Sequence, residues 1–160
     1  MTSPRPLLFP SALRAPGTVA APFETLLAIG DLPPGGMQRV TRGDLDILVV
    51  HTDEGIVAIE DRCPHMAAPL STGELEGCLV RCPLHKGVFD LRDGNVVVFP
   101  TTGGLSADGE SRPPWMPEGA EAKPAPPDTK ARARALTRVR RLRYFPLRVV
   151  EGRIEVALPR

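Results

Sequence analysis

Two short segments of the sequence combine the residue types that bind metals. They read RCPHM at 62–66 and RCPLHKG at 81–87, so both begin with Arg-Cys-Pro. Each segment offers one thiolate and one imidazole, and sixteen residues separate His65 from Cys82. The chain has only three cysteines, which is too few for a disulfide framework, so this spacing indicates metal binding.

The four candidate ligands, Cys63, His65, Cys82 and His85, fit two kinds of metal site. Two irons bridged by two sulfides need four terminal ligands, and two loops that each give one cysteine and one histidine complete that set. A structural zinc ion is the alternative, although C-x-H with one intervening residue is unusual for a single tetrahedral ion. The proline after each cysteine fixes φ and stiffens both loops. The third cysteine, Cys78, is interpreted as a small buried side chain.

Short apolar runs separated by turn signals surround these loops from about Leu26 onward, which predicts an all-β domain. Hairpin turns are expected at Gly43-Asp44, at the TDEG segment 52–55, at Asp93-Gly94 and at Glu151-Gly152. For the third of these hairpins, alternation predicts Phe89 opposite Val98 and Leu91 opposite Val96. For the fourth, it predicts Val149 opposite Ile154 and Leu147 opposite Val156.

Proline-rich segments set the expected domain limits. Residues 1–25 predict a flexible N-terminal arm, and residues 26–160 the domain itself. Within that domain, residues 101–129 hold six prolines and five acidic residues, and a basic run without any acid follows at 130–143. We therefore expect a Pro-rich surface insertion at about 101–142. The basic run fits docking to an acidic partner, contact with nucleic acid, or a solvated face that offsets the acidic insertion.

The two metal-binding segments resemble the Rieske [2Fe–2S] motif, C-x-H followed by C-x-x-H. The likeness continues through HKGVFDLRDG at 85–94 and YFPLRVVEGRIEVAL at 144–158. It implies Rieske-like antiparallel sheets with two cluster-binding loops at one tip, and a Rieske-type [2Fe–2S] cluster as cofactor. Within that resemblance Cys63 and Cys82 hold the buried iron, and His65 and His85 hold the outer one. Candidates for the rim of the docking face are Met66, Lys86 and Pro100.

The sequence differs from other branches of the Rieske family, and these differences indicate which kind of Rieske protein it is. The loop cysteines that form a disulfide in respiratory Rieske proteins correspond to Ala68 and Leu84. The serine and tyrosine hydroxyls near the cluster of those proteins correspond to Gly87 and Phe89. Without hydrogen bonds to sulfur the reduced cluster is less stable, so we expect a potential on the order of −150 mV. A terminal oxygenase needs a second iron held by two histidines, and only His51 remains.

The resemblance therefore implies a ferredoxin that is not itself an enzyme. It would pass single electrons from a flavoprotein reductase to a terminal oxidoreductase such as an oxygenase. Two alternatives stay open: the small Rieske subunit of a nitrite reductase, and a non-catalytic accessory or redox-sensing subunit. A formal net charge of +1 gives no general case for nucleic-acid or membrane partners. No apolar run is long enough for a signal peptide or a span, and we expect a cytoplasmic protein.

Overall fold

The structure, a computed structural model, describes residues 4–100 and 139–159. The described residues form antiparallel sheets with almost no helix, so the all-β prediction is confirmed. The strands are β1 (Phe23–Ala28), β2 (Met37–Arg42), β3 (Leu45–His51), β4 (Ile56–Glu60), β5 (Glu74–Glu76), β6 (Leu79–Arg81), β7 (Val88–Asp90), β8 (Val96–Val98), β9 (Tyr144–Phe145), β10 (Leu147–Val150) and β11 (Arg153–Ala157). Three short 3₁₀ helices accompany them: η1 (Ser11–Leu13), η2 (Ile29–Asp31) and η3 (Leu70–Thr72).

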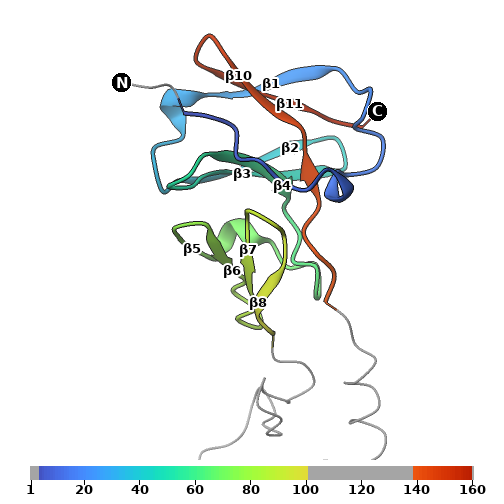
Figure 1. Ribbon diagram of the computed structural model, residues 1–160, viewed down its shortest axis with the longest axis vertical. Helices are drawn as coiled ribbons and strands as arrows, with labels where there is room; N and C mark the ends of the chain where they lie inside the picture. The colour runs from blue at the N-terminus through green and yellow to red at the C-terminus, as the bar shows by residue number, and fades with distance from the viewer. Residues whose placement is uncertain (1–3, 101–138, 160) are drawn as a thin grey trace, which may run out of the picture.

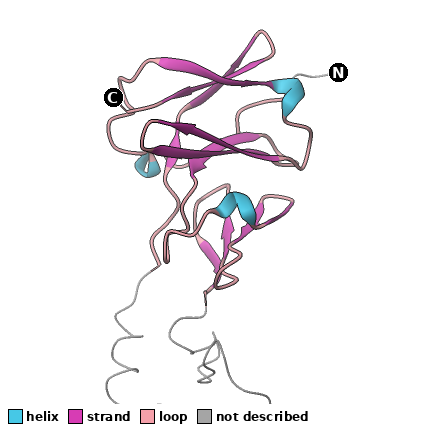
Figure 2. Cartoon of the chain, turned by 180° about the vertical axis from the view of Figure 1, so that it is seen from behind, coloured by secondary structure: helices cyan, strands magenta, loops and turns pink. Residues whose placement is uncertain are grey.

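The strands form three sheets that lie one above another (Figure 1). The top sheet has the order β1-β11-β10, the central sheet β2-β3-β4-β9, and the bottom sheet β5-β6-β7-β8. Figure 2 shows from behind that long loops lead from the central sheet down to the bottom sheet. Among the described residues, no helix is both long and apolar enough to cross a bilayer.

The central sheet is covered on both faces, which explains the continuous apolar runs of its middle strands. Successive side chains of a strand point to opposite faces. In β3, Ile47 and Val49 therefore join the upper core, and Leu48 and Val50 join the lower core. Strand β4 divides its side chains in the same way. The lower core also takes in Cys63 and Cys82, so the candidate site is built onto the central sheet.

Three of the four expected hairpin turns are confirmed, and the register of one hairpin is wrong. Strands β10 and β11 pair as predicted, but β7 and β8 pair Phe89 with Val96 and Val88 with Val98. The cause is a tight helical turn after β7, in which Gly94 N–H donates to the Asp90 carbonyl at 2.7 Å. This turn directs the Leu91 side chain into the lower core instead of across the hairpin.

Residues 4–22 pack against the domain, which differs from the flexible arm that we expected. Leu7 N–H donates to the Ile56 carbonyl at 2.7 Å, and Ala15 N–H donates to the Tyr144 carbonyl at 2.7 Å. The Phe9 ring stacks on Tyr144 with centroids 4.4 Å apart. These contacts extend the edge of the central sheet and bury Leu7 and Ala15. The limit between an N-terminal segment and a Rieske domain at residue 25 stays a prediction.

Most of the expected insertion lies outside the described residues. Positions 101–138 are not described, and the chain is described again from Val139 onward. Leu142 is buried there, and its N–H donates to the Gly94 carbonyl at 3.1 Å. The returning chain is therefore bonded to the turn after β7 before it enters β9.

Candidate metal centre

The two candidate metal-binding loops have the same backbone shape. In the first loop (residues 62–68), Cys63 N–H donates to the Ala68 carbonyl at 2.8 Å, and Ala67 N–H donates to the Cys63 carbonyl at 2.8 Å. In the second loop (residues 81–87), Cys82 N–H donates to the Gly87 carbonyl at 2.8 Å, and Lys86 N–H to the Cys82 carbonyl at 3.1 Å.

Both turns also place one residue in the left-handed region, since Ala67 and Lys86 each have φ 60°. Each cysteine thus holds the same place in its turn. The histidines do not: His65 is the third residue counted from its cysteine, and His85 is the fourth. The structure nevertheless brings the two imidazoles together, with ring centroids 4.9 Å apart and an interplanar angle of 82°. The difference of one residue between the two spacings therefore does not prevent the two imidazoles from meeting.

Both candidate cysteines lie inside the protein. The Cys63 and Cys82 residues are 3% and 1% exposed. Burial raises the pKa of the Cys63 thiol to about 11, although the N–H groups of His65 and Met66 lower it, and the neighbouring Cys82 thiol raises it further. The thiol is therefore protonated at neutral pH in the protein without metal, and a metal must displace that proton to bind sulfur.

The two histidines supply the observation that tests whether a metal group fits. The Nδ1 atoms of His65 and His85 are both buried and have no hydrogen-bond partner among the described residues. A buried polar atom without a partner is costly and calls for an explanation such as a bound ion. Burial, and then the nearby His85, lower the pKa of His65, which keeps its imidazole neutral as a metal ligand requires. Two thiols and two such nitrogens match the donor set of a Rieske-type cluster.

A buried carboxylate holds the first loop in place. Asp61 Oδ1 accepts the Ser71 N–H at 2.8 Å, and Oδ2 accepts the Ser71 hydroxyl at 2.6 Å and Arg39 Nη1 at 3.1 Å. The Asp61 side chain is fully buried, whereas that of Arg39 is 39% exposed. These contacts tie both ends of the first loop to strand β2. Sequence analysis missed this network, because nothing in the spacing of Asp61 and Ser71 predicts that they meet.

An apolar contact holds the second loop. A side-chain Cβ at Gly87 would lie 3.2 Å from Pro100 Cβ and 3.5 Å from the Phe89 ring. Glycine therefore lets Pro100 approach the loop closely. Pro100 is buried, while Met66 and Lys86 are exposed, so the three residues expected on the rim do not share one environment.

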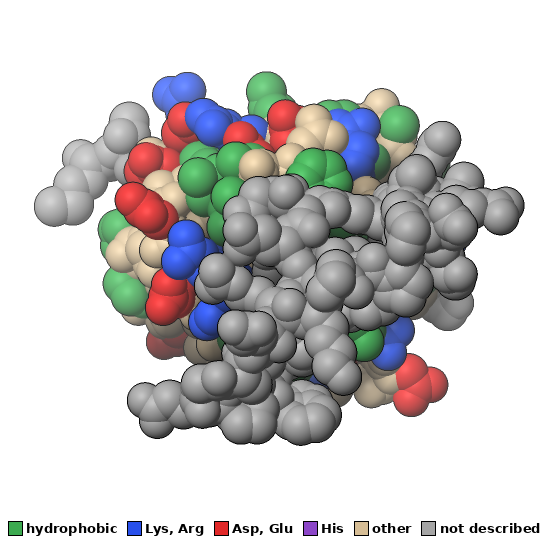
Figure 3. All heavy atoms as spheres, turned by 90° about the horizontal axis from the view of Figure 1, so that it is seen from below, with side chains coloured by type: hydrophobic (Ala, Val, Ile, Leu, Met, Phe, Trp, Pro, Cys, Tyr) green, Lys and Arg blue, Asp and Glu red, His purple; other side chains and the backbone are tan. Residues whose placement is uncertain are grey.

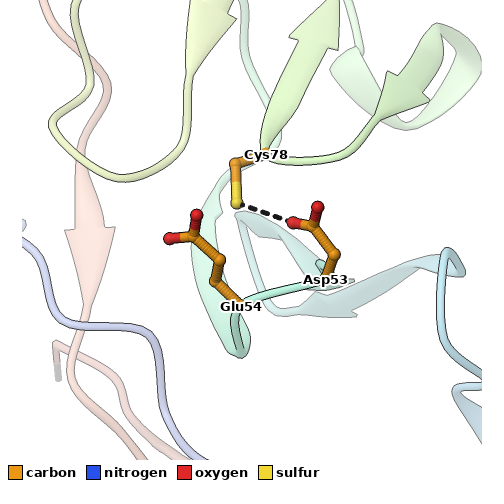
Figure 4. Close-up of side chains that lie close together, drawn as sticks. All are labelled: Asp53, Glu54 and Cys78. Atoms are coloured by element: carbon orange, nitrogen blue, oxygen red, sulfur yellow. Dashed lines mark hydrogen bonds between the residues drawn. The ribbon is translucent and has the colours of Figure 1, made fainter.

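The third cysteine lies outside this centre. Cys78 is buried as predicted, and its thiol donates to Asp53 Oδ1 at 3.2 Å, beside Glu54 (Figure 4). Burial raises the pKa of Cys78, and Asp53 raises it further, although a hydrogen bond with Thr52 opposes them. The Cys78 thiol is therefore bonded to a carboxylate and belongs to neither candidate metal-binding loop.

Comparison with known proteins identifies the family. Residues 24–107 match the family model described as the Rieske [2Fe-2S] domain. Over 75 residues the chain is 40% identical to the 3-phenylpropionate/cinnamic acid dioxygenase ferredoxin subunit of Photorhabdus laumondii, which covers 46% of this chain and 70% of the relative. Over 76 residues it is 34% identical to the naphthalene 1,2-dioxygenase system ferredoxin component of Pseudomonas aeruginosa, covering 48% and 73%.

A solved structure agrees with these relatives. The complex of reduced oxygenase and oxidized ferredoxin in carbazole 1,9a-dioxygenase contains a chain with a TM-score of 0.57 and 25% identity. The match covers 84% of this chain and 100% of that one. The protein thus belongs to the Rieske [2Fe-2S] domain family, as an electron-transfer protein whose cofactor is a Rieske-type [2Fe–2S] cluster.

Proposed function

We propose that Cys63, Cys82, His65 and His85 hold the cluster, and that the protein carries single electrons from a flavoprotein reductase to a terminal oxygenase in the cytoplasm. The observation that supports this most directly is the convergence of two buried thiols and two unpartnered Nδ1 atoms on one tip. All three cysteines are free thiols, which fits a reducing compartment. When bound, the cluster supplies reversible one-electron chemistry.

The surroundings of the four residues suit electron exchange with a partner at the tip. The thiols lie deep in the lower core, while the two histidines are only partly buried and so reach the surface. Apolar side chains are exposed near them: Met66 is 60% exposed, Leu84 57% and Phe99 56%. An apolar surface around a redox group excludes water from a protein–protein contact. Short-lived docking at the histidine edges is the arrangement that we propose.

The side chains next to the cysteines favour a low potential. Gly87 and Phe89 occupy the positions where high-potential relatives carry hydroxyls, and both are buried. Neither can donate a hydrogen bond from its side chain to a cluster sulfur. We therefore expect a potential on the order of −150 mV, near the lower end of the Rieske range.

The relatives favour an oxygenase as the electron acceptor. Those at 40% and 34% identity are named as ferredoxin components of dioxygenase systems, and the solved neighbour is a ferredoxin in complex with its oxygenase. The alternatives from sequence analysis, a nitrite reductase subunit and a redox-sensing subunit, gain no support of this kind.

The ligand assignment is tested by four single variants and one matched control. Each of Cys63→Ser, Cys82→Ser, His65→Ala and His85→Ala should lose acid-labile sulfide, visible absorption and the EPR signal of the dithionite-reduced protein. Cys78→Ser should keep all three, because Cys78 lies elsewhere and bonds to Asp53. Zinc without sulfide in the wild type, or loss of the cluster from Cys78→Ser but not from Cys63→Ser, would contradict the assignment. Electron transfer to a purified oxygenase then tests the partner.

A further inference from the structure

A groove rich in arginine opens beside the first loop. Its volume is about 320 Å³, and it adjoins His65. Glu60 is the one acidic residue among the described residues that line it, and Glu60 Oε1 lies 4.0 Å from Arg62 Nη1. The arginines that line it are Arg62, Arg140, Arg141 and Arg143. Four guanidinium groups facing one carboxylate make the groove strongly positive.

The arginines reach the groove because the chain before β9 is extended. Along residues 141–144 exposed and buried side chains alternate: Arg141 and Arg143 are exposed, whereas Leu142 and Tyr144 are buried. This alternation is what an extended backbone with one buried face produces. Glu60 N–H donates to the Arg143 carbonyl at 3.0 Å, which fixes this stretch next to the end of β4, immediately before the first loop.

One of these arginines is held in place without losing its charge. Arg141 Nε and Nη2 donate to the Asp93 carbonyl oxygen at 3.1 and 2.5 Å. A carbonyl is a neutral acceptor, so the guanidinium is oriented but not neutralised. Arg141 therefore adds a positive charge with a fixed position to the lining of a groove that also includes His65.

Elsewhere on the described surface, positive and negative side chains are mixed. The chain has a net charge of only +1, and on the rim visible from below in Figure 3 basic, acidic and apolar side chains are interspersed. Six arginines elsewhere lie within 4.0 Å of an acid, in the pairs Arg39–Asp46, Arg42–Glu24, Arg81–Glu74, Arg92–Asp90, Arg148–Glu155 and Arg153–Glu151. Each of these six arginines therefore has at least one acid nearby, whereas the four arginines that line the groove share one carboxylate among its described residues.

We propose that this groove is a docking site for an acidic face of the redox partner. The inference rests on the proposed function and adds the chemistry of the partner surface. A partner whose carboxylates enter the groove is held next to His65, where the electron leaves or enters. Complementary charge raises association rates and fixes orientation, and it does so most strongly at low ionic strength. The basic run noted in the sequence thereby gains a specific role for its last residues.

The test compares two double variants that change net charge equally. Arg140→Gln with Arg143→Gln removes two of the four positive charges of the groove and keeps the Arg141 anchor. Arg148→Gln with Arg153→Gln is the matched control, because both residues lie in the top sheet at exposed ion pairs. Stopped-flow measurement follows the transfer of one electron from the dithionite-reduced protein to anionic ferricyanide, which becomes ferrocyanide. Cationic hexaamminecobalt(III) serves as the oppositely charged acceptor, and a deca-glutamate peptide serves as the acidic ligand.

At low ionic strength the groove variant should react about fivefold more slowly with ferricyanide, and faster with the cobalt complex. It should also bind the peptide more weakly, and high salt should remove all three differences. The control should behave as the wild type. Equal rates and equal peptide binding for all three proteins would overturn the proposal, and so would tighter binding of a DNA oligomer of the same charge. If the protein held no reducible cluster, the proposed function would fail instead, so the two failures are distinguishable.

Discussion

The two candidate metal-binding loops share a backbone turn but are supported in different ways. The first loop is tied by the charged network of Asp61 and lies beside the arginine groove. The second is supported by the apolar contact of Gly87 with Pro100, and exposed apolar side chains such as Leu84 lie near it. One turn geometry therefore places both cysteines, while a charged network supports the first loop and an apolar contact supports the second. We infer that the shape of the turn positions the metal ligands, and that the residues around each loop form the surface that a partner protein contacts.

A substitution at Gly73, where the chain after the first loop contacts the second loop, should have the largest effect on stability. Gly73 follows η3, and a Cβ there would lie within 1.9 Å of the carbonyl oxygen of Arg81, which directly precedes Cys82. Since this neighbour is backbone, Gly73→Ala must displace one loop relative to the other. We expect a loss of about 3 kcal/mol in the free energy of unfolding, with loss of bound iron. Urea denaturation and iron analysis measure it, and Gly30→Ala, with open space around it, is the control.

Removing the polar support should weaken the first loop specifically. Asp61→Ala leaves the Ser71 N–H without its acceptor inside the protein, and we expect a loss of about 2 kcal/mol. Release of the cluster to a chelator should also become faster. Asp46→Asn removes the other carboxylate of Arg39 but keeps the hydrogen bond from Asp61 N–H to the Asp46 carbonyl, so it should cost less. Equal losses for the two variants would show that Asp61 does not support the loop.

Because the two loops share the same turn, we expect a glycine substitution in each to raise the free energy of unfolding by the same amount. Ala67 and Lys86 are exposed and both have φ 60°, a conformation that is strained for residues with a Cβ. Ala67→Gly and Lys86→Gly should therefore each raise the free energy of unfolding by roughly 0.5–1 kcal/mol. Parallel denaturation curves at one pH measure this. A gain in one loop and a loss in the other would break the equivalence of the turns.

The smallest effect is electrostatic and concerns the turn after β7. Hydrogen bonds from Arg92, outweighing partial burial, lower the pKa of Asp90 below 3.8. A lowered pKa in the folded state contributes stability above the unfolded value, and this contribution is lost as pH falls through the folded value. The stability difference between the wild type and Asp90→Asn should thus be constant from neutral pH to about pH 4 and shrink below it. Because Arg92 is exposed, we expect the change in the free energy of unfolding to be smaller for Asp90→Asn than for Ala67→Gly or Lys86→Gly. A difference that is constant down to pH 3 would contradict this.

Sequence analysis predicted what is encoded locally. Three hairpin turns and the alternation of β10 and β11 depend on neighbouring residues, and the structure agrees with them. The C-x-H and C-x-x-H segments are also read from neighbouring residues, and their role as ligands stays a proposal. Contacts between distant residues were not predictable. The first loop depends on Ser71 meeting Asp61, ten residues earlier. The arginine groove likewise needs β4 and the chain before β9 to lie side by side. The register at Phe89 was missed for a different reason: the helical turn closed by Gly94 is local, but a hairpin with a two-residue turn was assumed there.

The bonds that join Leu142 to Gly94 and Arg141 to Asp93 have a practical consequence. They fasten the described chain before position 101 to the described chain after position 138. Positions 101–138 therefore mark a place for grafting a foreign domain, for instance a fused reductase, directly beside the redox end of the molecule.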